Sequence, residues 1–413
     1  MAAEPKRVPI PKNGVDYRGK VVLAPMVRSG ELPSRLLALK YGADLVWGPE
    51  TVDKAIIGTT RKVCERTSTV YWSRQPSNGF KNKELNPHNR ESVIYRIHPT
   101  LESKQLIFQV GTASPTLAVQ AARLVAGDVA GIDVNAGCPK PFSTSGGMGA
   151  ALLQEPGKLC SILRALVEEV GKEFEIGISV KIRILDTPEE TEALVRKLVA
   201  TGITGLTVHC RTTPMRPRER AIRDQLRMIA GVCKEAGVAC LMNGDVENRE
   251  QALQLAEEYG VDGGMIATSA EKNSSVFRAK ADGGPAPWRE VVRHYIEYAM
   301  AVDNRWGNTK FLLAQLIPGK QQAPFRLDQC KTHVDLVNAL GFEDLLSKAR
   351  ELDEITGMNI KPDVKSGRAL KRAAAREANK SEAKKSKVQE VVNGQVDQEK
   401  EELTTAMAAA IAA

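Results

Sequence analysis

The sequence lacks any hydrophobic run that approaches the roughly 18 to 20 residues needed to cross a membrane as a helix. Its first residues, MAAEPKRVPIPKNG, contain no apolar core like that of a secretory signal. They also lack the arginine-rich and serine-rich, amphipathic composition of an organelle transit peptide. We therefore expect neither membrane insertion nor secretion.

Paired cysteines are missing as well. The 413 residues include seven cysteines, and no two of them form a C-x-x-C pair. The seven are Cys64, Cys138, Cys160, Cys210, Cys233, Cys240 and Cys330. An odd, widely scattered set in a chain of this length is typical of reduced thiols, and it argues against a disulfide framework or a zinc site. We expect a cytoplasmic protein, with the nucleus as a further location, and no bound metal.

No G-x-G-x-x-G motif follows the first apolar run, which argues against a doubly wound dinucleotide-binding sheet. What the sequence does contain is eight short apolar runs, most of them followed by a helical pattern. The runs lie at 21–24, 44–47, 106–110, 131–134, 178–182, 206–209, 238–242 and 263–266. The helical segments include 32–41, 117–125, 156–170, 188–200, 219–236 and 248–259. Alternation of eight strands with helices predicts an α/β fold, a (β/α)8 TIM barrel, with the doubly wound sheet as the alternative.

The pattern changes along the chain and suggests four parts. They are an N-terminal extension (1–17), the barrel (18–284), a small all-α domain (285–358) and a charged tail (359–413). The long connection between the second and third runs includes a further expected strand at 67–72. Pro285-Ala286-Pro287 marks the end of the barrel, because consecutive amphipathic helices without strands follow it.

The net charge of +8 and the isoelectric point near 9.0 permit a polyanionic partner. Residues 361–387 alone contain ten Lys and Arg against three Asp and Glu, a net charge of +7. Residues 388–413 contain one Lys against five acidic residues. We interpret the tail as a solvated, largely disordered segment, and the alternative is a phosphate-binding or nuclear-import segment.

Residues 131–153, GIDVNAGCPKPFSTSGGMGAALL, form the most informative stretch. A buried strand is expected to end before Asn135, and a glycine-rich turn and an Ala/Leu helix follow. Cys138 lies between a glycine and a proline that restrict the local backbone, at the mouth of the strand. A small buried cysteine would be the ordinary interpretation. The polar neighbours favour instead a thiol that exchanges a proton with a bound substrate.

Candidate site residues, most of them polar, follow or end the predicted strands all around the barrel. They are Met26, Glu50, Gln109, Asn135 with Cys138, Lys181 with Arg183, His209 with Arg211, Asn243-Gly244-Asp245, and Ala267-Thr268. The active site of a TIM barrel is built at this end of the strands. A ring of such residues is hard to explain as packing, so we expect the site there.

Two of the loops suggest a bound phosphate. Residues 243–245 and 266–270 are small and follow the last two strands, so their backbone N–H groups can approach an anion. A short helix expected near 274–277 would add its N-terminal dipole. Lys181 suits an anionic or electron-accepting cofactor ring. These features together indicate a phosphate-bearing cofactor without naming it.

Taken together, the motifs resemble those of the tRNA-dihydrouridine synthases, flavin enzymes that reduce a uridine of the tRNA D-loop. The matching pieces are LAPMVRSGELPSRLLALKYGADLV, FQVGTASP, residues 131–153, SVKIRIL, TVHCRT and MNGDV. They occur in the family's order between about residues 20 and 280, and the N-x-G-C-P motif with its glycine-rich turn is highly specific. The APMVR, KPFST and VHCRT forms most resemble the eukaryotic branch that modifies position 20.

The resemblance implies an FMN at the barrel mouth and NADPH, or NADH, as its reductant. The implied FMN contacts are Pro25, Met26, Val27, Gln109, Lys181, His209, Asn243, Gly244, Asp245, Ala267 and Thr268. Cys138 would protonate the uracil carbon that does not receive the hydride. The uridine must leave its stack to reach the site.

The same resemblance implies that Asn135 and Arg183 bind the uracil edge. Arg211, Arg216 and Arg218 lie in the basic stretch CRTTPMRPRERA, which differs from the bacterial-type sequence. We interpret them as tRNA contacts, and a solvated surface is the alternative for Arg216 and Arg218. The helical domain would be a tRNA-binding domain. We expect a monomer. The alternatives are an FMN barrel that reduces a small molecule of the dihydroorotate or enoate type, or a tRNA-binding protein without catalysis.

Overall fold

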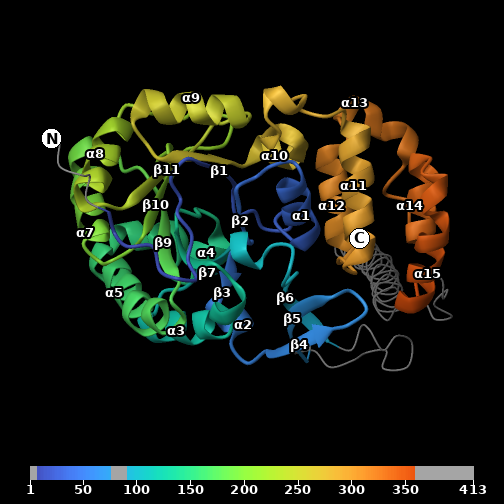
Figure 1. Cartoon of the computed structure of the whole chain (residues 1–413), viewed down its shortest axis with the longest axis horizontal. Helices are drawn as coiled ribbons and strands as arrows, with labels where there is room; N and C mark the ends of the chain where they lie inside the picture. Colours follow the sequence, from blue (N-terminus) through green and yellow to red (C-terminus); the bar gives the residue numbers. More distant parts are fainter. Residues whose placement is uncertain (1–6, 76–90, 359–413) are drawn as a thin grey trace, which may run out of the picture. The chain divides into compact units, whose positions relative to one another are not determined.

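The protein was analysed as a computed structural model, which describes residues 7–75 and 91–358. Eight parallel strands form its central ring (Figure 1). They are β1 (Lys20–Leu23), β2 (Leu45–Trp47), β7 (Leu106–Gly111), β8 (Gly131–Ala136), β9 (Gly177–Arg183), β10 (Gly205–His209), β11 (Ala239–Asn243) and β12 (Gly263–Ile266). Pairing between β2 and β7 closes the sheet, and the short β3 (Thr51–Val52) also pairs with β7. The predicted barrel is confirmed, and a closed ring excludes the doubly wound sheet.

Helices cover the outside of this ring (Figure 1). They are α1 (Leu32–Lys40), α3 (Pro115–Arg123), α5 (Pro156–Leu166), α7 (Pro188–Val199), α8 (Leu226–Ala236) and α9 (Arg249–Tyr259). Local sequence sets several of their ends. A capping box of Thr187 and Glu190 starts α7, the Ser114 hydroxyl caps α3, and Gly237 in the left-handed conformation ends α8. Each apolar strand is therefore buried between the barrel interior and a helix.

Two predicted helices differ from the structure. The helix expected over 219–236 begins only at Leu226, and residues 212–225 form a loop. The N–H of Ala221 donates to Oδ2 of Asp245, at 2.7 Å, instead of to the carbonyl of Pro217, which accepts from Arg211. The Ala/Leu stretch before residue 154 is a 3-10 helix, Gly149–Gln154, and the N–H of Ala150 near its start donates to the carbonyl of Cys138.

The N-terminal extension fills the barrel at the end opposite the predicted site. Tyr17 is 2% exposed and belongs to the same apolar cluster as Trp47 and Leu241. A β-carbon at Gly205 would lie 2.6 Å from the Tyr17 ring, so the strand passes this ring only because residue 205 has no side chain. Tyr17 therefore closes the interior of the barrel from the N-terminal ends of the strands.

A three-stranded antiparallel sheet is inserted after β2. It consists of β4 (Thr60–Cys64), β5 (Thr69–Arg74) and β6 (Ser92–Ile97), and β5 confirms the extra strand expected at 67–72. Trp72 of β5 is fully buried, and its indole N–H donates to the carbonyl of Leu124, at 3.0 Å. The inserted sheet is thus anchored to the connection that follows α3.

Consecutive helices follow the barrel, as predicted. They are α11 (Trp288–Ala301), α12 (Trp306–Leu316), α13 (Gly319–Gln322), α14 (His333–Leu340) and α15 (Leu346–Thr356). Leu37 and Tyr41 from the α1 region share one apolar cluster with these helices. The chain divides into two units at Gly357, and the predicted tail, 359–413, lies outside the described residues. The four-part division of the chain, including the boundaries at 17 and 284, stays a prediction. In the described part of the chain, no helix is long and apolar enough to cross a membrane.

Candidate active site

Strand register brings the predicted residues together at the carboxyl ends of neighbouring strands. Asn135 of β8 pairs with Lys181 of β9, Arg183 of β9 pairs with His209 of β10, and His209 pairs with Asn243 of β11. Because residues paired in register lie side by side, these five side chains share one rim of the barrel. The predicted location of the site is therefore consistent with the fold, and the role of each residue stays a prediction.

Lys181 is held by an amide from β11, two strands away along the rim. Its Nζ donates to Oδ1 of Asn243, at 3.0 Å, and Nδ2 of Asn243 donates to the carbonyl of Met265, at 2.9 Å. Burial and the neighbouring Arg183 lower the pKa of Lys181 to about 8. The ammonium group is thus fixed in position, and its pKa lies close to physiological pH.

Gln109 is oriented by a carboxyl group buried inside the barrel. Its Nε2 donates to Oδ2 of Asp133, at 2.7 Å, and Oδ1 of Asp133 accepts from the Ser179 hydroxyl, also at 2.7 Å. Burial raises the pKa of Asp133 to about 6, although both hydrogen bonds lower it. Asp133 and Ser179 alternate with the apolar residues of β8 and β9, and this pattern by itself predicts only two buried strands.

His209 accepts a hydrogen bond from an arginine. The Arg211 guanidinium lies 3.1 Å from Nε2 of His209, and a guanidinium can only donate. Nε2 is therefore unprotonated, and the proton of the neutral ring sits on Nδ1. Burial, followed by the positive charges of Lys181, Arg183 and Arg211, lowers the pKa of His209 to about 2. The ring is neutral throughout the physiological range, with a single N–H to offer.

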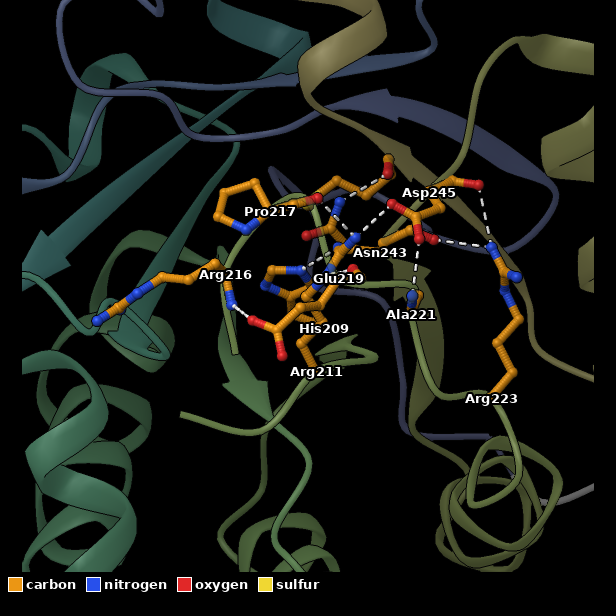
Figure 2. Close-up of polar contacts among 11 residues, drawn as sticks. His209, Arg211, Arg216, Pro217, Glu219, Ala221, Arg223, Asn243 and Asp245 are labelled. Atoms are coloured by element: carbon orange, nitrogen blue, oxygen red, sulfur yellow. Dashed lines mark hydrogen bonds and ion pairs between the residues drawn. The ribbon is translucent and has the colours of Figure 1, made fainter. Parts of the chain in front are cut away.

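Arg211 also ties the loop after β10 to the loop after β11, and Figure 2 shows it among its partners. Its Nε donates to the carbonyl of Glu219, at 2.7 Å, and its Nη2 to the carbonyl of Pro217, at 3.1 Å, and to Asp245. Arg223 adds hydrogen bonds to the backbone of Gly244 and Asp245. Arg211 is 4% exposed. This geometry gives Arg211 a structural role, and its predicted role as a tRNA contact has no support from these contacts.

Arg216 and Arg218 lie on the outside of the same loop and are exposed, as is Arg220. Figure 2 shows the Arg216 side chain extending away from the network around Arg211, and its backbone N–H donates to the Glu219 carboxylate. Within residues 7–75 and 91–358, the three side chains form no ion pair. They are free to meet a polyanion.

The cysteine loop is shaped by Asn135 and Arg183. Oδ1 of Asn135 accepts from the N–H groups of Gly137, at 3.0 Å, and Cys138, at 3.1 Å. Nε of Arg183 donates to the carbonyl of Gly137, at 2.8 Å, and its Nη1 to the carbonyl of Thr212, also at 2.8 Å. Cys138 is half-buried, and burial raises the pKa of its thiol. The loop thus presents a protonated thiol on a fixed backbone.

Glu50, from the loop after β2, and Ser143, from the same loop as Cys138, complete the surroundings of the thiol. Glu50 follows β2, and its carboxyl group interacts with the Cys138 thiol and the Asn135 side chain. The Ser143 hydroxyl donates to Oε1 of Glu50, at 2.8 Å. Glu50 was expected at the rim, but its contact with Cys138 and the part played by Ser143 were missed. An acidic residue just after the second strand was the available signal.

The loop after β1 carries Pro25, Met26 and Val27. The N–H of Gly30 donates to the carbonyl of Met26, at 2.7 Å, which closes a tight turn. Met26 is partly buried and Val27 is 49% exposed. The guanidinium of Arg28 lies 4.1 Å from the centre of the Phe311 ring of α12. The predicted cofactor loop is therefore braced by the helices that follow the barrel.

The two predicted phosphate loops differ in what they offer. Gly244 has a φ of +117°, and a β-carbon there would lie 3.3 Å from Cδ2 of His209. The Asp245 carboxylate is paired with Arg211 and the Asp245 carbonyl accepts from Arg223, so only a backbone N–H group of this residue could meet an anion. A short helix, α10 (Thr268–Lys272), starts directly at the end of the loop after β12. The segment at 274–277 is a 3-10 helix whose N-terminal N–H, from Ser275, is already used by Asn273.

The described rim residues offer no cluster that could hold a metal. No group of three or more His, Cys, Asp or Glu side chains suited to a metal ion occurs among residues 7–75 and 91–358. All seven cysteines are free thiols. The donor set at the rim, with an ammonium, amides, a neutral imidazole and a thiol, suits an organic cofactor and proton transfer.

Comparison with known proteins gives the family. The profile of the dihydrouridine synthase (Dus) family matches residues 80–337. The chain is 49% identical to the tRNA-dihydrouridine(20) synthase of Schizosaccharomyces pombe, over 80% of this chain and 66% of that protein. It is 46% identical to the enzyme of the same name from Saccharomyces cerevisiae, over 77% of this chain and 82% of that protein. The chain is 29% identical to the tRNA-dihydrouridine(20a/20b) synthase of S. pombe, over 66% of this chain and 72% of that protein. The chain therefore belongs to the dihydrouridine synthase family.

Proposed function

We propose that this protein reduces a uridine at position 20 of tRNA to 5,6-dihydrouridine. The family match supports the reaction type, and both relatives above 45% identity carry names for position 20. The relative named for positions 20a and 20b is much less similar, at 29%. Those names also include NAD(P)+, which supports NADPH or NADH as the reductant.

The rim residues fit FMN as the bound cofactor. Asp133 takes the Gln109 amide N–H, which leaves the amide oxygen to accept from the imide N–H of the flavin ring. Lys181 and the Nδ1–H of His209 would meet the electron-rich side of the ring. Asn243, Gly244, Asp245, Ala267 and Thr268 would hold the phosphate through the backbone of two loops, and Pro25, Met26 and Val27 would pack against the ring.

The chemistry divides between the cofactor and the cysteine. FMN, once reduced by the nicotinamide, would be the source of the hydride for the uracil double bond. Hydride addition leaves negative charge on the other carbon of that bond, which needs a proton. Cys138 donates this proton from its thiol, while Asn135 and Arg183 keep the cysteine loop in place. Lys181 and Arg183 would stabilise the developing negative charge.

The tRNA must bring a flipped base to this rim and be held by its phosphates. Arg216 and Arg218 are exposed on the loop beside His209, and we assign them to phosphate contacts. The helices after the barrel brace the loop that carries Met26 and would form a second tRNA surface. Asn135, Arg183 and Arg211 remain candidate substrate contacts, although Oδ1 of Asn135 accepts from the backbone and most N–H groups of the two arginines donate to the protein itself. A monomer is the proposed state. The cytoplasm, with the nucleus as a further location, is the proposed compartment, in keeping with seven free thiols.

One observation carries this proposal: a thiol is fixed at the carboxyl end of β8, beside the ammonium of Lys181. The test is Cys138→Ala. The variant should keep its flavin and oxidise NADPH normally, yet form dihydrouridine about 10²-fold to 10⁴-fold more slowly, because a positioned general acid is removed. Mass spectrometry of tRNA measures the product.

Cys160→Ala is the matched control, since Cys160 lies in α5, away from the rim. It should leave product formation unchanged. Near-normal dihydrouridine formation by Cys138→Ala would contradict the assignment of the proton donor. Normal NADPH oxidation without any tRNA product from the unaltered protein would point instead to a small-molecule substrate.

A further inference from the structure

A carboxyl group from a distant loop reaches the cysteine that acts as the proton donor. Glu50 lies in the connection between β2 and β3, 93 residues before Ser143, whose hydroxyl donates to its Oε1 at 2.8 Å. The same carboxyl group interacts with the Cys138 thiol and the Asn135 side chain. Glu50, Ser143, Asn135 and Cys138 therefore form one polar cluster, which we call the thiol cluster.

Two glycines make room for the thiol cluster. A β-carbon at Gly111, the last residue of β7, would lie 2.5 Å from Oε1 of Glu50. A β-carbon at Gly149 would lie 2.5 Å from both the Cys138 carbonyl oxygen and the Ser143 hydroxyl. Gly149 also has a φ of +58°, which favours glycine. A side chain at Gly111 would displace the Glu50 carboxyl group, and a side chain at Gly149 would displace the cysteine loop. The thiol cluster therefore requires glycine at both positions.

The charges around Cys138 explain why a carboxyl group is useful there. Lys140 lies in the cysteine loop itself, and Lys181 and Arg183 of β9 also interact electrostatically with the thiol. Cations favour a thiolate, which cannot donate a proton. Glu50 acts in the opposite direction: in addition to burial, its nearby carboxyl group raises the pKa of Cys138.

We propose that Glu50 is a positioning residue that keeps Cys138 protonated among these cations and directs its S–H bond. The inference rests on the proposed function, in which the Cys138 S–H bond breaks as a C–H bond forms on the uracil. Ser143 and Asn135 hold the Glu50 carboxylate against the thiol. No electrons are exchanged with Glu50, and the thiolate left after each turnover regains its proton from water.

The test measures the thiol directly, without tRNA. Alkylation by iodoacetamide is followed on the Cys138 peptide by mass spectrometry, across pH 6 to 10, in the purified full-length protein. Glu50→Gln keeps the size of the side chain and removes its charge. A neighbouring charge shifts a pKa by about one unit or more. Since a more acidic thiolate is also a weaker nucleophile, we expect about threefold faster alkylation below the thiol pKa.

Four further variants test whether the charge of Glu50 is responsible for the change in alkylation rate. Glu50→Asp retains the charge and should restore most of the slow alkylation. Lys140→Gln removes a cation and should slow alkylation, the opposite direction to Glu50→Gln. Glu155→Gln removes an exposed carboxylate that pairs with Lys158, so it is the matched control and should change nothing. Ser143→Ala frees the Glu50 carboxylate and should shift alkylation in the same direction as Glu50→Gln.

The same variants are compared in dihydrouridine formation. In Glu50→Gln the alkaline limb of the pH–rate profile should move to lower pH by the same amount as the alkylation midpoint. NADPH oxidation should stay unchanged. An unchanged alkylation midpoint in Glu50→Gln would overturn the inference, even if Cys138→Ala abolishes product. Normal product formation by Cys138→Ala would instead overturn the proposed proton donor, and it would leave the effect of Glu50 on the thiol pKa intact.

Discussion

Replacement of Arg35 by methionine should destabilise the protein by about 3–5 kcal/mol. Arg35 lies in α1 and is 1% exposed, as is its partner Glu102. Nε and Nη2 of Arg35 each donate to one carboxylate oxygen of Glu102, both at 2.7 Å. Nη1 donates to the carbonyl of Gly30, at 2.9 Å, and Nη2 also donates to the carbonyl of Arg96, at 2.7 Å. The pair thus joins α1, the inserted sheet and the loop after β1.

The size of this destabilisation follows from the groups that lose their partner when Arg35 is replaced by methionine. Methionine has a similar length and is flexible enough to fill the space, so little volume is vacated. The Glu102 carboxylate, however, stays buried without its cation, and such an orphaned charge costs about 3–5 kcal/mol. Two carbonyl oxygens are also left without this donor, at about 1 kcal/mol or more each, which favours the upper end of that range.

Urea unfolding followed by circular dichroism measures this destabilisation. Arg123→Met is the control, because Arg123 forms an exposed pair with Glu173 that should contribute less than about 1 kcal/mol. The double variant Arg35→Met with Glu102→Met should recover most of the stability, since it removes both buried charges. A decrease below about 1 kcal/mol in Arg35→Met would refute this reasoning. A double variant as unstable as the single one would do the same.

Two further predictions concern the cofactor and the tRNA. Lys181→Ala should lower the FMN content of the purified protein, measured by absorbance, because a fixed cation at the ring is removed; full flavin retention would remove Lys181 from the residues that bind the cofactor. Arg216→Gln with Arg218→Gln should flatten the slope of log tRNA affinity against log salt by about 0.7 to 0.9 for each phosphate that the protein no longer neutralises. Deletion of the residues after Ile360 tests the basic tail in the same titration, and an unchanged slope in either variant would exclude that segment from phosphate binding.

The sequence was sufficient to predict the strands and which residues follow their carboxyl ends. Each strand is a short apolar run, and burial on both faces selects such runs regardless of what lies elsewhere in the chain. The segment around Cys138 was equally clear, because Asn135, Gly137 and Cys138 are adjacent in sequence and their hydrogen bonds are local. The capping box that starts α7 spans four residues and could be predicted for the same reason.

Local sequence could not place residues whose partners are distant. Residues 219–225 have a helical pattern, yet Arg211 and Asp245 take the backbone groups that a helix would use. Arg35 has the sequence context of an exposed helical arginine, but its carboxylate partner arrives from 67 residues away. In each case a hydrogen bond formed only in the folded chain outweighs a local preference of a few tenths of a kcal/mol per residue.

At the site itself, Glu50 is also a residue whose partner only the folded structure reveals. From the sequence it is one acidic residue after a strand, and nothing near it in the chain indicates a thiol partner. The closed barrel brings the loop after β2 to the loop after β8, and Gly111 leaves the space that the carboxyl group occupies. Local patterning thus determined which residues reach the rim. The tertiary structure alone decided which of them touch, because the interactions that alter a pKa act over a few ångströms in space and are independent of distance along the chain.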